Sequence, residues 1–354
     1  MKICVLILCV FMIITTTSTQ STRIINVYDK PFNIYWNVPT FQCRGKKVFF
    51  EELNAKYNII TNQNDSFKGD KMVIMYDPGN FPAILTDDET GYTILRNGGV
   101  PQAGNLTKHL EMFQRAVEND FPDINYSGLA VIDFESWRPI YNQNWGSLIP
   151  YKDLSVEIEA ELHPMWTLAE LKQEAERRFE LEGRKYVEDT LRHARKLRPN
   201  AIWGYYAYPY CYNMQSPDYL PICSDSVVAD NDRLNWMFDS SQSLHPSLYF
   251  GESLTADQRR QLMEGRVYEA VRVKNQFGEN KRIYPYFWFV YRDTRNFMSE
   301  EDLLNAFSIF KSYGTDGMII WGSSSDVNTK QKCKDLYNYI DTVLGPAIVK
   351  FRRF

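Results

Sequence analysis

The stretch Gly128-Leu129-Ala130-Val131-Ile132-Asp133-Phe134-Glu135 is an apolar run that ends abruptly in two carboxylates, and it predicts a strand. Side chains alternate across a strand, so Asp133 and Glu135 point to the same side, about 7 Å apart at their Cα atoms. Two carboxyl groups held close in a partly buried setting cannot both ionise easily, so one pKa is raised and that group keeps a proton near neutral pH. Such pairs cleave glycosidic bonds. The plainer alternative is an acidic strand end that faces solvent or pairs with Arg138.

Other short apolar or aromatic runs also predict strands, and amphipathic stretches lie between them. The expected strands cover residues 32–38, 72–76, 128–134, 202–206, 247–250, 284–290 and 317–321, and the clearest helices cover about 167–196, 256–275, 300–313 and 330–344. Alternation of strand and helix indicates parallel strands with right-handed crossovers. Seven such units without a glycine-rich dinucleotide motif favour a barrel over a doubly wound sheet. We therefore expect an α/β fold of a single domain, a (β/α) TIM-like barrel with about seven strands.

Polar and aromatic residues follow the expected strands directly. They include residues 76–79, 133–138, 205–210, Tyr249 and 321–326. In a barrel the carboxyl ends of all strands meet on one face, where active sites lie. These residues therefore predict one groove with carboxylates on its floor and aromatic walls. For any single tyrosine, a cap on the core with its hydroxyl in water remains the simpler explanation.

The N-terminus has the pattern of a secretory signal peptide. Lys2 precedes an apolar run from Ile3 to Ile14, and a short Thr/Ser stretch follows. We expect a signal peptide over residues 1–19, a short segment over 20–30, and a catalytic barrel domain over 31–354. The apolar run is too short for a membrane span, so we expect a secreted protein without a membrane anchor.

Four cysteines remain after the expected signal peptide: Cys43, Cys211, Cys223 and Cys333. An even number in a secreted chain predicts two disulfides, for which three pairings are possible. Cys211 and Cys223 bracket a loop rich in proline and tyrosine, so a local bridge is the natural choice, which leaves Cys43 with Cys333. Their spacings match no zinc pattern. Three glycosylation sequons agree with secretion, at Asn64, Asn105 and Asn125.

Several classes of chemistry lack the residues that they need. We expect the four histidines, His109, His163, His193 and His245, to lie in loops or helices away from strand ends. This placement disfavours a metal-dependent hydrolase. There is no Gly-x-Ser-x-Gly elbow and no phosphate loop, so we expect neither a cofactor nor a metal. The net charge of −4 argues against nucleic-acid binding. Carboxylate chemistry on a sugar remains.

Six segments in this order resemble signature segments of the hyaluronidase family (glycoside hydrolase family 56), most closely its insect venom type. They are residues 33–40 (NIYWNVPT), 76–79 (YDPG), 97–102 (NGGVPQ), 132–139 (IDFESWRP), 203–206 (WGYY) and 321–326 (WGSSSD). The resemblance spans essentially the whole mature chain. It implies a distorted seven-stranded (β/α) barrel that cleaves the β-1,4 bond between N-acetylglucosamine and glucuronic acid in hyaluronan, with retention of configuration.

The resemblance also implies roles by position. Glu135 corresponds to the proton donor, and Asp133 to the group that orients the substrate acetamide, which serves as the nucleophile. Further matches are Tyr206 and Tyr249 as active-site tyrosines, Arg266 and Trp321 as lining residues, and Tyr76, Asp77, Ser323 and Ser324 as substrate contacts. The family's two bridges fall on Cys43–Cys333 and Cys211–Cys223. This chain has Ser136 where relatives commonly carry Arg. We expect the side chain of Ser136 to face away from Glu135.

Three functional hypotheses remain. The first is a secreted endo-hyaluronidase that acts as a monomer, with hyaluronan as its substrate, chondroitin as a second candidate, and Arg138 and Arg266 as local cations in the groove. The second is a non-catalytic hyaluronan-binding protein on the same fold, against which the intact Asp133 and Glu135 argue. The third is a chitinase-like enzyme, which normally has a longer run of aspartates before its glutamate; residues 128–132 contain none.

Overall fold

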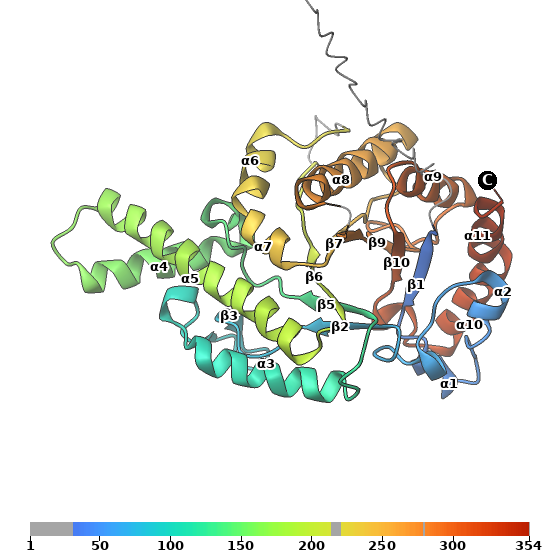
Figure 1. Ribbon diagram of the computed structural model, residues 1–354, viewed down its shortest axis with the longest axis horizontal. Coiled ribbons are helices and arrows are strands. Elements are labelled where there is room, and N and C mark those ends of the chain that lie inside the picture. Colours follow the sequence, from blue (N-terminus) through green and yellow to red (C-terminus); the bar gives the residue numbers. More distant parts are fainter. Residues whose placement is uncertain (1–30, 214–220, 279, 354) are drawn as a thin grey trace, which may run out of the picture.

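Parallel strands form the centre of the molecule in the computed structural model, which describes residues 31–213, 221–278 and 280–353 (Figure 1). They are β1 (Asn33–Asn37), β2 (Met72–Tyr76), β5 (Leu129–Asp133), β6 (Ile202–Ala207), β7 (Ser243–Pro246), β8 (Arg282–Ile283), β9 (Tyr286–Trp288) and β10 (Gly317–Trp321). The strands pair in the orders β2-β5-β6-β7-β8 and β1-β10-β9. A parallel bridge between Ser247 and Tyr286 joins the two groups into a barrel.

The barrel is distorted between β1 and β2, which do not pair with each other. A short segment that includes Ile60 and Asn62 lies there instead. The backbone N–H of Trp36 donates to the carbonyl of Ile60 (2.9 Å), and the side chain of Asn62 bonds both backbone groups of Met72 (2.9 and 3.0 Å). These bonds satisfy strand edges that a regular barrel would pair directly.

Helices surround the strands, as Figure 1 shows. They are α1 (Phe41–Arg44), α2 (Leu53–Tyr57), α3 (Leu106–Asp120), α4 (Ile149–Leu162), α5 (Leu168–Leu197), α6 (Asp225–Arg233), α7 (Asn235–Ser240), α8 (Ala256–Phe277), α9 (Glu300–Ser312), α10 (Lys330–Tyr339) and α11 (Gly345–Phe351). Capping boxes begin α5 at Thr167 and α8 at Thr255. At 30 residues α5 is about 45 Å long, so its first turns extend beyond the barrel and pack on α4.

The interior of the barrel is filled by alternate residues of the strands. Met72, Ile74, Leu129, Val131, Tyr284, Tyr286 and Ile319 form one buried cluster there. The residues between them in sequence, such as Val73 and Ala130, pack outward against the helices. Both faces of the strands are therefore apolar, as expected for a parallel sheet covered by helices.

The expected barrel and most of the expected elements are confirmed. The helices expected at 167–196, 256–275 and 300–313 correspond to α5, α8 and α9, and the fourth continues past residue 344 through a π-helical turn, Ile340–Leu344, into α11. The strand expected at 284–290 is interrupted at Pro285, which cannot donate a ladder hydrogen bond. The structure also contains an antiparallel hairpin, β3 (Ala83–Thr86) with β4 (Thr93–Arg96), that was not expected.

Two expectations around β7 are wrong. The strand expected at 247–250 lies four residues earlier, at Ser243–Pro246. The buried Leu248 and Phe250 belong to the loop after it, and the strand ends in Pro246, a residue that is depleted in strands. His245 is therefore a strand residue and not a loop residue. Its ring bonds the hydroxyl of Ser243 (2.8 Å) and the carbonyl of Tyr284 (3.0 Å) inside the fold, which is a structural role.

Two disulfides tie distant parts of the chain. Cys43–Cys333 joins α1 to α10 across 290 residues, and Cys211–Cys223 closes a loop of 12 residues after β6. These are the pairings expected from the sequence. The sequon residues Asn64, Asn105 and Asn125 are exposed. The expected signal peptide lies outside the described residues, among which no helix is long and apolar enough to cross a membrane.

Candidate active site

The carboxyl ends of β2, β5, β6, β9 and β10 surround a cavity of about 660 Å³. The strand register places Tyr76 of β2 beside Asp133 of β5, and the backbone N–H of Asp77 donates to the carbonyl of Asp133 (2.7 Å). The cavity is lined by Ile74, Tyr76, Asp77, Asp133, Glu135, Ser136, Tyr206, Tyr249, Tyr286, Trp288, Arg295 and Trp321. Residues from distant parts of the sequence thus meet at one end of the barrel.

The two carboxylates face this cavity because the residues around them are anchored on the other side. Phe134 stacks on Phe81 with 4.0 Å between the ring centroids, and the buried Trp137 donates from Nε1 to the carbonyl of Pro82 (2.8 Å). Asp133 and Glu135 then share a side-chain hydrogen bond. The same-side arrangement expected from strand periodicity is what the structure contains.

Burial raises the pKa of both carboxyl groups. For Asp133 the negative charges of Glu135 and then Asp77 raise the pKa further. For Glu135 burial dominates, and the positive charge of Arg138 acts in the opposite direction. The hydrogen bond that the two groups share raises the pKa of Asp133 and lowers that of Glu135. The pair therefore keeps one proton well above the usual carboxyl range, and without substrate that proton lies on Asp133. The cavity therefore contains both an acid and a carboxylate at the same time.

Tyrosine hydroxyls surround the pair and stay neutral. The Tyr206 hydroxyl donates to Ser247 Oγ (3.2 Å), and the Tyr76 hydroxyl accepts from Nε1 of Trp321 (2.8 Å). Burial raises the pKa of Tyr76 to about 12 and that of Tyr206 higher still. Tyr249 packs against the indole of Trp321 at 5.7 Å between centroids. The walls are therefore flat aromatic faces with hydroxyl donors, which suit a sugar ring.

A second cavity of about 950 Å³ adjoins the first and shares Glu135, Tyr206 and Tyr249 with it. Arg138 lies in this second cavity inside a box of three aromatic rings. Its guanidinium carbon is 5.1 Å from the ring centre of Tyr210 and 5.7 Å from those of Tyr212 and Trp145. Stacking on aromatic faces holds the guanidinium and leaves its positive charge in the cavity.

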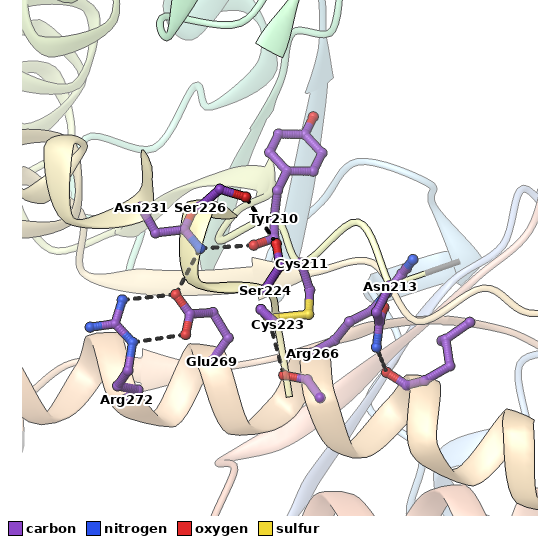
Figure 2. Close-up of a disulfide and its surroundings, with 12 residues drawn as sticks. Tyr210, Cys211, Asn213, Cys223, Ser224, Ser226, Asn231, Arg266, Glu269 and Arg272 are labelled. Atoms are coloured by element: carbon purple, nitrogen blue, oxygen red, sulfur yellow. Dashed lines mark hydrogen bonds and ion pairs between the residues drawn. A yellow bond between two sulfur atoms is a disulfide. The ribbon is translucent and has the colours of Figure 1, made fainter. Parts of the chain in front are cut away.

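Arg266 of α8 also lines the second cavity, where it connects three parts of the chain. Its Nε donates to Asn213 Oδ1 (3.0 Å), and its Nη1 donates to the carbonyl of Ser247. Burial lowers its pKa to about 10, so it remains charged at neutral pH. Figure 2 shows Arg266 next to the Cys211–Cys223 bridge, which closes the segment after β6. Within that segment Asn213 Nδ2 donates to the carbonyl of Leu262 in α8 (3.0 Å).

The same segment is fastened a second time through a buried carboxylate. Asn231 Nδ2 donates both to the carbonyl of Tyr210 (2.8 Å) and to Glu269 Oε1 (2.7 Å), and Arg272 pairs with Glu269 at 2.8 Å (Figure 2). Since Tyr210 is one wall of the box around Arg138, the bridge and this network together hold the box in place.

The structure brings most of the expected site residues together, and it adds others. Tyr76, Asp77, Asp133, Glu135, Tyr206, Tyr249 and Trp321 line the first cavity, and Arg138 and Arg266 line the second. Ser323 and Ser324 lie in the turn after β10, outside both lining sets; Ser323 bonds Ser325 (2.6 Å), and Ser324 accepts from Gln42 (3.0 Å). Among the described residues, no group of His, Cys, Asp and Glu could hold a metal ion.

Ser136 also lines the first cavity, and its hydroxyl bonds the side chain of Tyr151. Strand β5 ends at Asp133, so the alternation of sides no longer applies at residue 136. The sequence also missed Tyr286, Trp288 and Arg295 in the first cavity and Trp145 and Tyr212 in the second. Tyr286 and Trp288 lie in β9, inside the expected strand. Arg295 lies seven residues further on and reaches the cavity over the ring of Trp288 (4.1 Å), a contact that no local pattern signals.

Comparisons with known proteins agree on one family. The family model described as hyaluronidase matches residues 21–353. A hyaluronidase from Apis mellifera is 47% identical over 93% of this chain and 86% of its own length, and hyaluronidase B from Vespa velutina is 46% identical over 90% and 96%. The crystal structure of bee venom hyaluronidase in complex with a hyaluronic acid tetramer superposes with a TM-score of 0.87 at 48% identity, over 90% of this chain and 98% of that one.

Proposed function

The chain belongs to the hyaluronidase family, and on that premise we propose that it is a secreted endo-β-N-acetylhexosaminidase that hydrolyses β-1,4 bonds between N-acetylglucosamine and glucuronate in hyaluronan. One observation carries the proposal. A buried carboxyl pair that shares one proton lies between two adjoining cavities at the strand ends of a barrel. A groove open on both sides of the acid suits cleavage within a long chain.

In the proposed first step the substrate supplies its own nucleophile. The acetamido oxygen attacks the anomeric carbon while Glu135 gives its proton to the glycosidic oxygen, and the bond between that oxygen and the anomeric carbon breaks. Asp133 accepts a hydrogen bond from the acetamido N–H, and its negative charge stabilises the positive charge that grows on the resulting ring. This scheme needs one acid and one carboxylate together, which matches a pair that holds a single proton. The hydrogen bond from the acetamido N–H favours the charged form of Asp133, so substrate binding would move the shared proton onto Glu135.

In the second step water attacks the anomeric carbon from the side that the leaving group has left. Glu135, now a carboxylate, takes the proton of that water, and the cyclic intermediate opens back to the acetamide. Two inversions give net retention of configuration. Tyr206 and Tyr249 line both cavities, where their neutral hydroxyls would contact substrate oxygens.

The second cavity is the proposed site of the leaving half of the chain, with Arg138 and Arg266 facing its carboxylates. Tyr76, Asp77 and Trp321 would contact the other half, and Ser323 and Ser324 would meet substrate only beyond the first cavity. Local arginines would offset a net charge of −4, which is unfavourable for a polyanionic substrate. We also infer that the protein is a monomer and that residues 1–19 are removed as a signal peptide. The catalytic domain would then cover residues 31–354, after the short segment 20–30, and glycans would occupy the three exposed sequons.

The test is product analysis of purified protein incubated with hyaluronan and, in parallel, with chondroitin. A hydrolase releases saturated oligosaccharides with N-acetylglucosamine at the new reducing end, and their masses identify the bond that was cut. A folded protein that retains hyaluronan but releases no reducing ends would be the binding protein of the alternative hypothesis. Product from chondroitin at a comparable rate would widen the proposed substrate class.

A further inference from the structure

The loop that follows β2 is held by an unusual number of side chains from other elements. This loop, residues 77–82, begins at Asp77 on the rim of the first cavity and has no regular secondary structure of its own. Asp77 has a φ of 44°, in the left-handed region that side chains other than glycine rarely adopt. Such a conformation persists only where the surroundings impose it.

Arg96, the last residue of the unexpected hairpin, makes the strongest of these contacts. Its Nη1 and Nη2 donate to the two carboxylate oxygens of Asp77 (2.5 and 2.8 Å), and its Nε donates to the carbonyl of Phe81 (2.8 Å). One planar guanidinium thus joins both ends of the loop, a geometry that lysine cannot copy.

Three further side chains bond backbone groups of the loop, two at Asn80 and one at Pro82. Asn97 Nδ2 donates to the carbonyl of Asn80 (2.6 Å), and the N–H of Asn80 donates to Nδ1 of His109 (2.9 Å). Trp137, two residues after Glu135, donates to the carbonyl of Pro82. The loop is therefore fastened to the hairpin, to α3 and to the segment that carries the proton donor.

The segment 97–102, one of the signature segments, explains how Arg96 and Asn97 reach the loop together. Asn97, Gly98 and Gly99 have φ values of 48°, 82° and 78°, so the chain reverses sharply at the end of β4. A Cβ at Gly98 would lie 2.4 Å from the carbonyl oxygen of Ala103, which leaves room only for glycine. The turn directs Arg96 and Asn97 back onto residues 77–82.

We propose that Arg96 is a positioning residue of the active site, which holds the loop after β2 so that Asp77 stays beside the Asp133–Glu135 pair with its charge compensated. The inference rests on the proposed function, since it concerns the same carboxyl pair. Asp77 touches that pair through the backbone, because its N–H donates to the carbonyl of Asp133. The negative charge of the Asp77 carboxylate also raises the pKa of Asp133, although by less than burial and the charge of Glu135 do.

The sign of the expected electrostatic effect follows from these charges. Without Arg96 no cation compensates the negative charge of Asp77. Loss of the last proton from the Asp133–Glu135 pair is then less favourable, so the pKa values of the pair rise. The other groups that face the pair from neighbouring elements are neutral tyrosines or arginines, namely Tyr76, Tyr206, Tyr210, Tyr249, Tyr286, Arg138 and Arg295. Asp77 is 41% exposed, so solvent screens part of the effect.

The test compares Arg96→Gln with Arg96→Lys. Arg44→Gln is the control, because Arg44 pairs on the surface with Glu51, a carboxylate as exposed as Asp77 but outside both cavities. For Arg96→Gln we expect kcat/KM on hyaluronan to fall about tenfold, as for a misplaced catalytic group, and the pH profile to move to higher pH. Arg96→Lys should keep the native profile position and recover part of the rate. The double variant Arg96→Gln/Asp77→Asn should return the profile to the native pH or below it.

Carboxyl-carbon NMR titration of the Asp133–Glu135 pair supplies a second readout that does not need turnover. The pair should titrate at higher pH in Arg96→Gln than in the native protein or in Arg44→Gln. Unchanged titration in a folded Arg96→Gln protein would overturn the inference, as would equal rate losses in Arg96→Gln and Arg96→Lys without a profile shift. A native protein that cleaves no hyaluronan would refute the proposed function, while the NMR result would still decide the role of Arg96.

Discussion

The two cavities that meet at Glu135 are both walled by tyrosines, yet they differ in charge. Carboxylates outnumber arginines in the first, which contains Asp77, Asp133 and Glu135, whereas arginines outnumber carboxylates in the second, which contains Arg138, Arg266 and Arg292. The first cavity raises carboxyl pKa values and keeps a proton for the reaction. The second presents positive charge, which would suit an anionic chain. On the proposed function, reaction and polyanion binding would be separated by one side chain, that of Glu135.

The largest effect is expected from Glu135→Gln, which removes the acid at the boundary between the cavities. The amide keeps the shape of the side chain but cannot protonate the glycosidic oxygen, so turnover should fall by about 10²- to 10⁴-fold. Hyaluronan binding and the circular dichroism spectrum should remain native, because both cavities stay intact. Glu301→Gln, on the exposed start of α9, is the control. A folded Glu135→Gln protein that cleaves at a near-native rate would mean that another group is the proton donor.

Asp133→Asn should be nearly as severe, by about 10²-fold in kcat, because the amide offers no negative charge to the developing cation. The fold should tolerate it, since an amide oxygen still accepts a hydrogen bond. A cyclic thiazoline analogue of the intermediate should bind the native protein much more tightly than the variant, as measured by calorimetry. Equal binding to both proteins would contradict the charge-stabilising role of Asp133.

Arg138→Gln tests whether the second cavity binds the substrate and also acts on the first. We expect KM to rise about tenfold through the loss of a charged contact, and kcat to change less. Arg138 lowers the pKa of Glu135, so its removal raises that pKa, and the basic limb of the pH profile should move to higher pH. Arg138→Lys should keep the basic limb in place.

The matched control for Arg138 is Arg184→Gln. Arg184 also lies over an aromatic ring, that of Trp236 at 5.3 Å, but it lies on α5 outside both cavities. It should change neither KM nor the pH profile. If Arg138→Gln behaves in the same way, the contrast between the cavities has no functional meaning.

Tyr206→Phe and Tyr249→Phe probe the walls that both cavities share. Each variant loses only a hydroxyl, so we expect kcat to fall about tenfold, which is the loss of about one hydrogen bond to the substrate. Tyr206→Phe also loses its bond to Ser247, so its thermal midpoint should fall more than that of Tyr268→Phe on the surface, while the fold remains native. Full activity in both variants would show that these tyrosines only close the core.

The smallest effect on catalysis is expected from the disulfides, and it should differ between them. Replacing Cys211 and Cys223 by alanine should lower the free energy of unfolding by about 3 kcal/mol and raise KM, because the bridge holds the wall that contains Tyr210. Replacing Cys43 and Cys333 should cost about 4–5 kcal/mol, since that bridge closes a much longer loop, yet leave KM unchanged. Urea titrations and steady-state kinetics on both double variants check this; a KM change in the second pair alone would contradict it.

Much of the site could be predicted because it depends on local periodicity. Strand alternation predicted that Asp133 and Glu135 share one side, which holds although β5 ends at Asp133, because Phe134 and Trp137 anchor the chain on the other side. The convergence of parallel strand ends predicted that Tyr76, Tyr206 and Trp321 meet in one cavity. The rule failed where the strand itself was misplaced. Leu248 and Phe250 look like a strand in sequence, but they pack as a loop, and the true strand contains His245 and Pro246.

The sequence by itself determined the parallel α/β architecture, the carboxyl pair and its order in the chain, because burial pattern and alternation are properties of neighbouring residues. Only the tertiary structure decided what lies around that pair. The contact of Arg96 with Asp77 and the box of Trp145, Tyr210 and Tyr212 around Arg138 join residues from separate elements. No local pattern encodes such contacts, and the proton affinity of the pair depends on burial and on the charges that the folded barrel brings near it.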